Sequence, residues 1–197
     1  MTDRGQTAEQ VGPYGSTALW NFIALFLALA GAGGSVYLSL GLGLKACPLC
    51  FYQRSFVIAV VLVVAMLLWL DGLRSARAGL AALPLAASGL GVAAFHFFLV
   101  QTGKLECPPA LFGWGDGPLQ SLAIFAGLTI VCLAGAWPSR RSLPRGGLPA
   151  IVAALLVGAA SAWACVASAP PLPPAPAQPY DPVKQPFDMC RPPFQGQ

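Results

Sequence analysis

The sequence carries very little charge. Only 9% of its 197 residues are Asp, Glu, Lys or Arg, whereas 56% are hydrophobic. A water-soluble domain of this length would need about a quarter of its residues charged to cover its surface. The shortage of charge excludes an ordinary soluble globular protein, and we expect lipid to be the solvent for most of the chain.

Basic surface and histidine are also scarce. The formal net charge is only +4, and no basic segment interleaved with aromatic residues is present, which excludes a nucleic-acid-binding function. There is a single histidine, and no internal repeat is visible. What the chain does contain is six cysteines. They can be interpreted only after each has been assigned to a compartment.

Five apolar stretches are each long enough to cross a membrane, because about 20 residues of helix span a hydrocarbon layer of ~30 Å. They cover approximately residues 17–44, 51–70, 78–100, 119–137 and 148–169. We therefore predict an all-α integral membrane protein with five transmembrane helices. The first stretch is too long for the apolar part of a signal peptide. We expect it to be retained, and tilted or bent near Gly31, Gly33 and Gly34.

Basic residues at the helix ends predict the orientation in the membrane. The N-terminal segment and the connections after the second and fourth stretches carry most of them: Arg4, Arg74, Arg77, Arg140, Arg141 and Arg145. The two opposite loops contain only Lys45 and Lys104. We therefore expect residues 1–16 and 138–147 to be cytoplasmic and the tail, residues 170–197, to be extracytoplasmic.

This orientation divides the cysteines into two groups. Four are predicted on the oxidising, extracytoplasmic side: Cys47, Cys50, Cys107 and Cys190. Cys132 and Cys165 fall within spans, where we interpret them as small buried apolar residues. Residues 170–186 are rich in proline, so we expect an extended tether that can bring Cys190 back over the helices.

One external pair begins the second predicted helix. The segment from Lys45 to Arg54 reads Lys-Ala-Cys-Pro-Leu-Cys-Phe-Tyr-Gln-Arg, and Pro48 suits a first helical turn. Both sulfur atoms then lie at a helix N-terminus, where the helix dipole favours the thiolate. Arg54 follows Cys50 by four residues, on the same helix face. A structural disulfide or half of a metal site is the alternative for the cysteines, and snorkelling to the headgroups is the alternative for the arginine.

Together these residues resemble the DsbB family of disulfide-forming membrane oxidoreductases, in which a Cys-x-x-Cys pair begins the second helix and a Tyr-x-Arg-like segment follows. Residues 95–103, Phe-His-Phe-Phe-Leu-Val-Gln-Thr-Gly, are similar to the histidine-bearing end of the family's third helix. The resemblance covers about residues 19–137, so we assign residues 17–137 to a four-helix transmembrane bundle of DsbB type. The fifth helix, residues 148–169, and the tail are additions to that pattern.

The resemblance implies a thiol:quinone oxidoreductase of the bacterial inner membrane, with ubiquinone or menaquinone near Cys50 and Arg54. Cys50 would form a charge-transfer or covalent adduct with the quinone ring, and Cys47 would exchange with a second disulfide. Arg54 would stabilise the thiolate and the reduced quinone. His96 would line the same pocket, or serve only as an interfacial polar anchor. The implied partners are the quinone pool and a periplasmic DsbA-like thioredoxin-fold protein.

The second external loop departs from the family. In the family it carries both cysteines of the disulfide that exchanges with the soluble partner, but residues 101–118 contain only Cys107. We predict a Cys107–Cys190 disulfide, which would pass electrons to Cys47 and Cys50. An unpaired Cys190 and a Cys107–Cys165 disulfide are the alternatives.

We also assign roles to three residues in and just after the second external loop. Trp114 is interpreted as an interfacial anchor within a tight turn. Gln120 and Ser121 would cap the fourth helix or contact the quinone, and we favour the cap.

Two other functions stay open. A soft-metal carrier or sensor would use the external cysteines, although the single histidine, the lack of a Cys-His cluster in the sequence and the cation of Arg54 count against it. A membrane scaffold braced by disulfides would tolerate the loss of Cys50.

Overall fold

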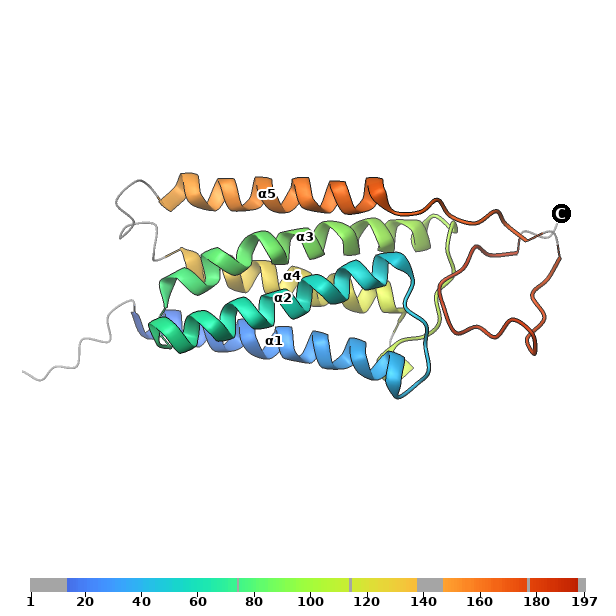
Figure 1. Ribbon diagram of the computed structural model, residues 1–197, viewed down its shortest axis with the longest axis horizontal. Helices are drawn as coiled ribbons and strands as arrows, with labels where there is room; N and C mark the ends of the chain where they lie inside the picture. The colour runs from blue at the N-terminus through green and yellow to red at the C-terminus, as the bar shows by residue number, and fades with distance from the viewer. Residues whose placement is uncertain (1–13, 74, 114, 138–146, 177, 195–197) are drawn as a thin grey trace, which may run out of the picture.

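The protein is a bundle of long helices, shown by a computed structural model that describes residues 14–73, 75–113, 115–137, 147–176 and 178–194 (Figure 1). The elements are α1 (Tyr14–Leu40), α2 (Pro48–Asp71), α3 (Ala76–Gln101), the short 3-10 helix η1 (Leu111–Gly113), α4 (Gly117–Ala136) and α5 (Gly147–Ser168). All five α-helices are long and apolar enough to cross a membrane. The prediction of an all-α membrane protein with five spans is confirmed.

Large apolar side chains on the outer faces of the helices indicate where lipid would lie. Phe26 is 70% exposed, Trp69 88% and Trp163 74%. Such a surface would be unstable in water, since burial of apolar area is the main force that holds soluble folds together. The molecule is a multi-pass membrane protein.

The helix starts follow from local sequence. α2 begins at Pro48, with Cys47 as its N-cap, and α4 begins at Gly117, where the Asp116 side chain accepts a hydrogen bond from the Leu119 N–H. The cap predicted at Gln120 and Ser121 is therefore wrong, because Asp116 already fills that position. α1 continues without interruption through its glycines and ends at Leu40, four residues before the predicted end of the apolar stretch.

Small residues allow α3 to approach its neighbours closely. A Cβ atom added at Gly79 would lie 2.9 Å from the Cys132 carbonyl oxygen of α4, and one added at Gly158 of α5 would lie 2.9 Å from the Pro84 carbonyl oxygen of α3. Cys132 is 1% exposed in the core, as expected of a small apolar residue. α1 to α4 pack together, whereas α5 packs along α3 at the edge of the bundle (Figure 1).

One end of the bundle carries every segment that was predicted to be extracytoplasmic. The α1–α2 connection, the α3–α4 connection and the tail after α5 meet there (Figure 1). The predicted cytoplasmic N-terminus with Arg4, the loop with Arg140, Arg141 and Arg145, and the residues Arg74 and Trp114 lie outside the described residues. The orientation of the bundle in the membrane therefore stays a prediction.

Candidate active site at the two cysteine pairs

Cys47 and Cys50 form a pair of adjacent thiols at the start of α2. Their Sγ atoms are 2.7 Å apart, and the Cys47 sulfur also accepts a hydrogen bond of 3.2 Å from the Cys50 backbone N–H. Cys47 is buried and Cys50 is half-buried, and neither is in a disulfide. Because a disulfide bond is about 2.05 Å long, a small movement of the two side chains is enough for this pair to oxidise.

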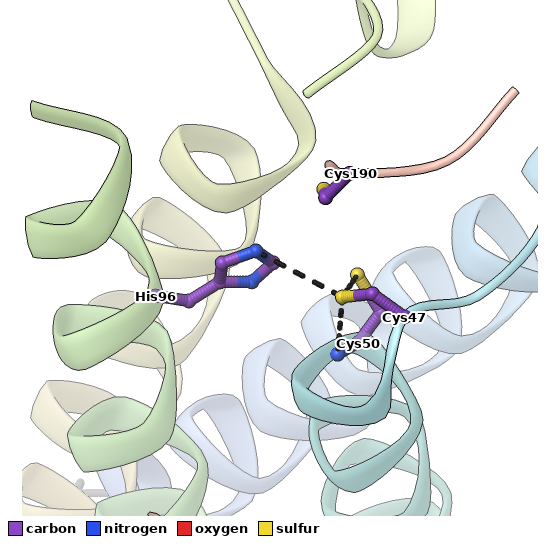
Figure 2. Close-up of side chains that lie close together, drawn as sticks. All are labelled: Cys47, Cys50, His96 and Cys190. Atoms are coloured by element: carbon purple, nitrogen blue, oxygen red, sulfur yellow. Dashed lines mark hydrogen bonds between the residues drawn. The ribbon is translucent and has the colours of Figure 1, made fainter. Parts of the chain in front are cut away.

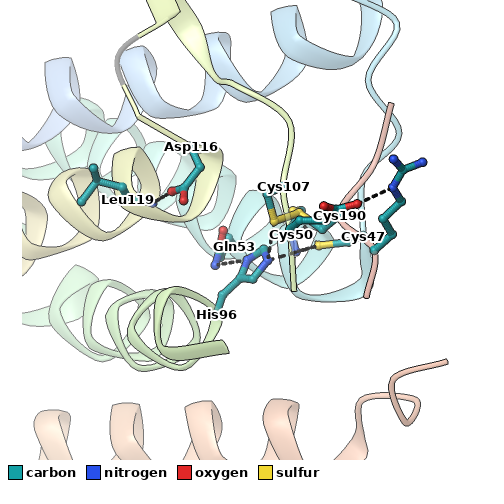
Figure 3. The surroundings of a disulfide bond; sticks show 10 residues. Cys47, Cys50, Gln53, His96, Cys107, Asp116, Leu119 and Cys190 are labelled. Carbon is teal, nitrogen blue, oxygen red and sulfur yellow. Dashed lines mark hydrogen bonds and ion pairs between the residues drawn. A yellow bond between two sulfur atoms is a disulfide. The ribbon is translucent and has the colours of Figure 1, made fainter. Parts of the chain in front are cut away.

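Cys107 and Cys190 form the second pair, and they are joined by a disulfide across a sequence separation of 83 residues (Figure 3). The pairing predicted from the sequence is confirmed. Cys165, the alternative partner, is a free thiol near the C-terminal end of α5. The tail thus returns over the end of the bundle and supplies a sulfur atom that the α3–α4 connection lacks.

Polar contacts on both sides of the disulfide hold the tail in place. Glu106 and Arg191 each donate a backbone N–H to the other's carbonyl oxygen, at 2.8 and 3.0 Å, and Arg191 Nε donates to Glu106 Oε1 at 2.7 Å. The Arg191 guanidinium also stacks on the Tyr180 ring, 3.8 Å from its centroid. On the other loop, Lys45 bonds Asp188 through its backbone N–H, at 2.7 Å, and through its ammonium group, at 2.8 Å. We call these two pairs, Glu106–Arg191 and Lys45–Asp188, the tail clamp.

His96 lies between the two cysteine pairs. Its Nε2 atom is 3.8 Å from Cys47 Sγ and 3.7 Å from Cys107 Sγ, and its Nδ1 atom is 3.4 Å from the side-chain nitrogen of Gln53 (Figures 2 and 3). The residue is 0% exposed, so it is not an interfacial anchor. It comes from α3, whereas the sulfur atoms come from α2, the α3–α4 connection and the tail. The fold alone brings them together.

Hydrogen bonds lower the pKa of Cys47 to about 5. The largest cause is the hydrogen bond that the Cys50 thiol donates to the Cys47 sulfur; the His96 ring and the Cys50 backbone N–H act in the same direction, while burial opposes them. These hydrogen bonds favour the thiolate form of Cys47. The sequence predicted a thiolate here from the helix N-terminus, but its thiol neighbour and a histidine from another helix account for most of the effect.

A cavity of about 400 Å³ opens beside the cysteines, between α1, α2 and α4. Cys50, Cys107 and Cys190 reach its wall, and so do Arg54 and Gln53. Gln120 and Ser121 also line it. His96 is not among the lining residues, contrary to the prediction that it lines the pocket; it lies beside the sulfur atoms of Cys47 and Cys107 instead.

Arg54 is fixed to α1 by three hydrogen bonds. Its Nε donates to Ser35 Oγ at 2.9 Å, and its Nη2 donates to the Ser35 carbonyl oxygen at 2.8 Å and to Ser39 Oγ at 2.6 Å. A side chain that only snorkels to the headgroups would be directed away from the bundle, so this alternative does not describe Arg54. The two serines, four residues apart on α1, keep the guanidinium on the cavity wall.

Sequence reasoning missed several residues of this site. Ser35 and Ser39, the partners of Arg54, were detectable as polar residues one turn apart on an apolar helix. Glu106 and Arg191 were detectable as opposite charges next to Cys107 and Cys190 in the sequence. The contact of Gln53 with His96 had no sequence signal, because the two residues are separated by 43 positions.

The chain is similar to known disulfide bond formation proteins. The family model described as "Disulfide bond formation protein DsbB" matches residues 16–122. Disulfide bond formation protein B 1 of Pseudomonas aeruginosa is 38% identical over 103 residues, which are 51% of this chain and 63% of that protein. The probable disulfide formation protein of Chlamydia muridarum is 32% identical over 116 residues, 53% of this chain and 84% of that protein. No solved structure matches the chain.

The family match covers only part of the candidate site. It includes Cys47, Cys50, Arg54, His96 and Cys107, and it ends within α4. α5, the tail and Cys190 therefore lie beyond the family match, and the alignment covers less than two thirds of the Pseudomonas relative.

Proposed function

The chain belongs to the DsbB family of disulfide bond formation proteins, and from this premise we propose that it is a membrane thiol:quinone oxidoreductase. It would reoxidise an extracytoplasmic, DsbA-like thioredoxin-fold dithiol protein and pass the electrons to quinone. The observation that carries the proposal is the proximity of the two cysteine pairs, since the sulfur atoms of Cys47, Cys50 and Cys190 lie within 4.8 Å of one another.

The first step takes electrons from the dithiol protein. A thiolate of that protein attacks the Cys107–Cys190 disulfide, and its second thiol then resolves the mixed disulfide. The dithiol protein leaves as a disulfide, with Cys107 and Cys190 reduced by two electrons. Both cysteines are half-buried at the outer end of the bundle, where a soluble partner can reach them.

The second step moves the electrons inward. With Cys47 and Cys50 oxidised to a disulfide, Cys190 attacks Cys47 and Cys50 leaves as a thiolate. Cys107 then attacks Cys190 and releases Cys47, which restores the Cys107–Cys190 disulfide. A leaving thiol with a low pKa is released faster, so the lowered pKa of Cys47 favours this direction. The products of this step are two thiols at the start of α2 and a Cys107–Cys190 disulfide. The four cysteines have this arrangement in the structure.

His96 is proposed to assist through the sulfur atoms. Its Nε2 lies within 4 Å of both Cys107 and Cys47, the attacking and the leaving sulfur of the last exchange. It can accept the proton of the Cys107 thiol and then donate a hydrogen bond to the Cys47 thiolate. This role replaces the direct contact with quinone that was predicted for His96.

The cavity beside Cys50 fits a quinone head group. Its volume is within the range of small-molecule sites, about 300 to 1,000 Å³, and its wall is mostly apolar with few polar groups. Arg54 and Gln120 place polar groups on that wall, and Cys50 is a thiol that lines it. When bound, quinone supplies the oxidant that accepts two electrons and two protons. Arg54 stabilises negative charge there, and the bonds to α1 fix its position in advance.

The proposed location is the bacterial inner membrane, with the N-terminus cytoplasmic and the C-terminus extracytoplasmic. The arginines at the predicted inner ends of the spans support it. Labelling of intact cells with a membrane-impermeant thiol reagent after mild reduction should modify Cys190 and leave Cys132 untouched. Protection of Cys190 in intact cells, with modification only after the membrane has been opened, would reverse the orientation.

The test of the function is quinone reduction by the purified protein supplied with a reduced thioredoxin-fold dithiol protein. We expect the native chain to reduce quinone and Cys50→Ser to be inactive. Cys165→Ser, which removes a free thiol outside both pairs, is the matched control and should behave as the native protein. If the native chain leaves quinone untouched, the oxidoreductase proposal fails.

A further inference from the structure

Three sulfur atoms and one imidazole converge at the outer end of the bundle. The ligand atoms of Cys47, Cys50, His96 and Cys190 all lie within 4.8 Å of one another (Figure 2). The sequence counted against a metal site because it contains no Cys-His cluster. The structure corrects this point, because His96 follows Cys47 by 49 residues and still lies beside it.

We propose that the fully reduced chain binds one zinc ion at this cluster, through the thiolates of Cys47, Cys50 and Cys190 and the imidazole of His96. Three thiolates and one imidazole are a common donor set for tetrahedral zinc. This inference goes beyond the proposed function, and zinc binding requires neither quinone nor a dithiol protein.

The distances match a tetrahedral site after small movements. With Zn–S bonds of about 2.3 Å, two sulfur ligands are separated by about 3.8 Å. Cys47 Sγ and His96 Nε2 are already 3.8 Å apart, close to the separation that a sulfur and a nitrogen ligand require. Cys47 Sγ and Cys50 Sγ are 2.7 Å apart and must separate by about 1 Å, which rotation of the half-buried Cys50 side chain can provide.

Gln53 supplies the support that a histidine ligand needs. A metal-bound imidazole usually donates its second ring N–H to a neighbouring acceptor, which fixes its tautomer and orientation. The Gln53 amide lies 3.4 Å from His96 Nδ1 and is buried. Because an amide can present its oxygen or its nitrogen after rotation by half a turn, Gln53 can accept this hydrogen bond when Nε2 holds the metal.

The cations near the cluster are occupied by other partners. The guanidinium of Arg54 is bound to Ser35 and Ser39 of α1, Lys45 pairs with Asp188, and Arg191 pairs with Glu106. Lys45 and Arg191 are thus paired with carboxylates, whereas the two serines leave the positive charge of Arg54 in place. Three thiolates bring three negative charges against this one cation, so the cluster still attracts a zinc ion.

The oxidation state of the second pair controls the site. In the Cys107–Cys190 disulfide the Cys190 sulfur carries no negative charge and is not a ligand for zinc. A dithiol reductant adds two electrons and two protons to that disulfide and is itself oxidised. Zinc binding then releases the protons of the thiols that were still protonated. The bound ion would occupy sulfur atoms of both pairs and stop exchange between them.

The experiment is a zinc titration of the full-length protein in detergent micelles, in competition with a chromophoric chelator. The protein reduced with a phosphine, which does not compete for zinc as a dithiol would, should take up one equivalent tightly. The protein that retains its Cys107–Cys190 disulfide should bind at least about tenfold more weakly. Even residues that only support a ligand change metal affinity by about 10-fold to 100-fold, so Cys47→Ser, Cys190→Ser and His96→Ala should each weaken binding by at least that much.

Two control variants and a second readout keep the test decisive. Cys132→Ser and Cys165→Ser retain all four proposed ligands and should bind zinc as the native chain does. Gln53→Leu should weaken binding about tenfold without removing a ligand.

Cadmium supplies the second readout. In place of zinc it should give thiolate charge-transfer absorption, and the intensity of this absorption should fall in Cys190→Ser. Equal affinity of the reduced and disulfide-bonded proteins, or of the native chain and Cys190→Ser, would overturn the proposal, and neither outcome would touch the quinone assay.

Discussion

The helical bundle and the C-terminal tail hold their cysteines by different means. Cys47 and Cys50 belong to a helix terminus that is packed against α1 and α3, in the part of the chain that matches the family. Cys190 belongs to a segment without helix or strand, held by the tail clamp and by its own disulfide. Contacts within a packed core fix position, whereas exposed ion pairs and single hydrogen bonds can open separately. One pair held by helix packing beside the cavity, and one held by a disulfide and partly exposed ion pairs, would suit the proposed relay between a lipid-soluble and a water-soluble partner.

The largest effect is expected from the loss of Cys190, which should stop electron transfer from the tail but not from the bundle. Cys190→Ser should abolish quinone reduction driven by a thioredoxin-fold dithiol protein, because the tail disulfide can no longer form. The same variant should still reduce quinone when dithiothreitol is the donor, since a small dithiol can react with Cys47 and Cys50 directly. Parallel assays with the two donors measure this difference. Equal loss with both donors would show that the tail serves the bundle rather than the partner.

A large effect is also expected within the bundle at Arg54. Arg54→Gln should lower kcat/KM for quinone about 100-fold, the loss typical of removing one preorganised electrostatic contact. Thiol exchange between the two cysteine pairs should stay close to native, because Arg54 bonds α1 rather than the tail. Arg77→Gln, at an exposed arginine of the opposite end, is the matched control. A defect in exchange with unchanged quinone kinetics would contradict the assignment.

A smaller effect is expected from the tail clamp. Arg191→Glu places two acidic residues side by side and should slow internal exchange about twofold to fivefold, because a partly exposed ion pair contributes about 0.5 to 1 kcal/mol. The double variant Glu106→Arg/Arg191→Glu restores opposite charges and should recover most of the rate. The rate is measured by rapid quenching after the tail disulfide has been reduced. Failure of the double variant to recover would indicate that charge is not what holds the tail.

The smallest effect at neutral pH concerns the ionisation of Cys47. With its pKa lowered to about 5, Cys47 should be a thiolate above that pH and a thiol below it. The measurement is thiolate absorbance of the native chain with Cys47 and Cys50 reduced and the Cys107–Cys190 disulfide intact. His96→Ala removes a hydrogen bond to the thiolate and should move the midpoint upward. Exchange by the variant should then decline at a higher pH than in the native chain. An unchanged midpoint would assign the low pKa to Cys50 and the helix terminus alone.

Sequence reasoning succeeded where a signal was local. The five spans follow from the length of the apolar stretches, and the start of α2 follows from Pro48 behind Cys47, because helix starts and lipid exposure depend on neighbouring residues. The Cys107–Cys190 pairing was predicted because only one other cysteine was expected on a flexible external segment. The cap of α4 was assigned to the wrong residues although the correct one, Asp116, stands just before the helix.

The sequence by itself determined that the chain is a membrane protein with a Cys-x-x-Cys pair at a helix start, since composition and short spacing are local signals. The tertiary structure decided what surrounds that pair. It placed His96 of α3 between two sulfur pairs, moved it off the cavity wall, and fixed Arg54 to two serines of α1. These contacts join residues far apart in the chain, so they depend on how the helices and the tail pack together, which no local pattern encodes.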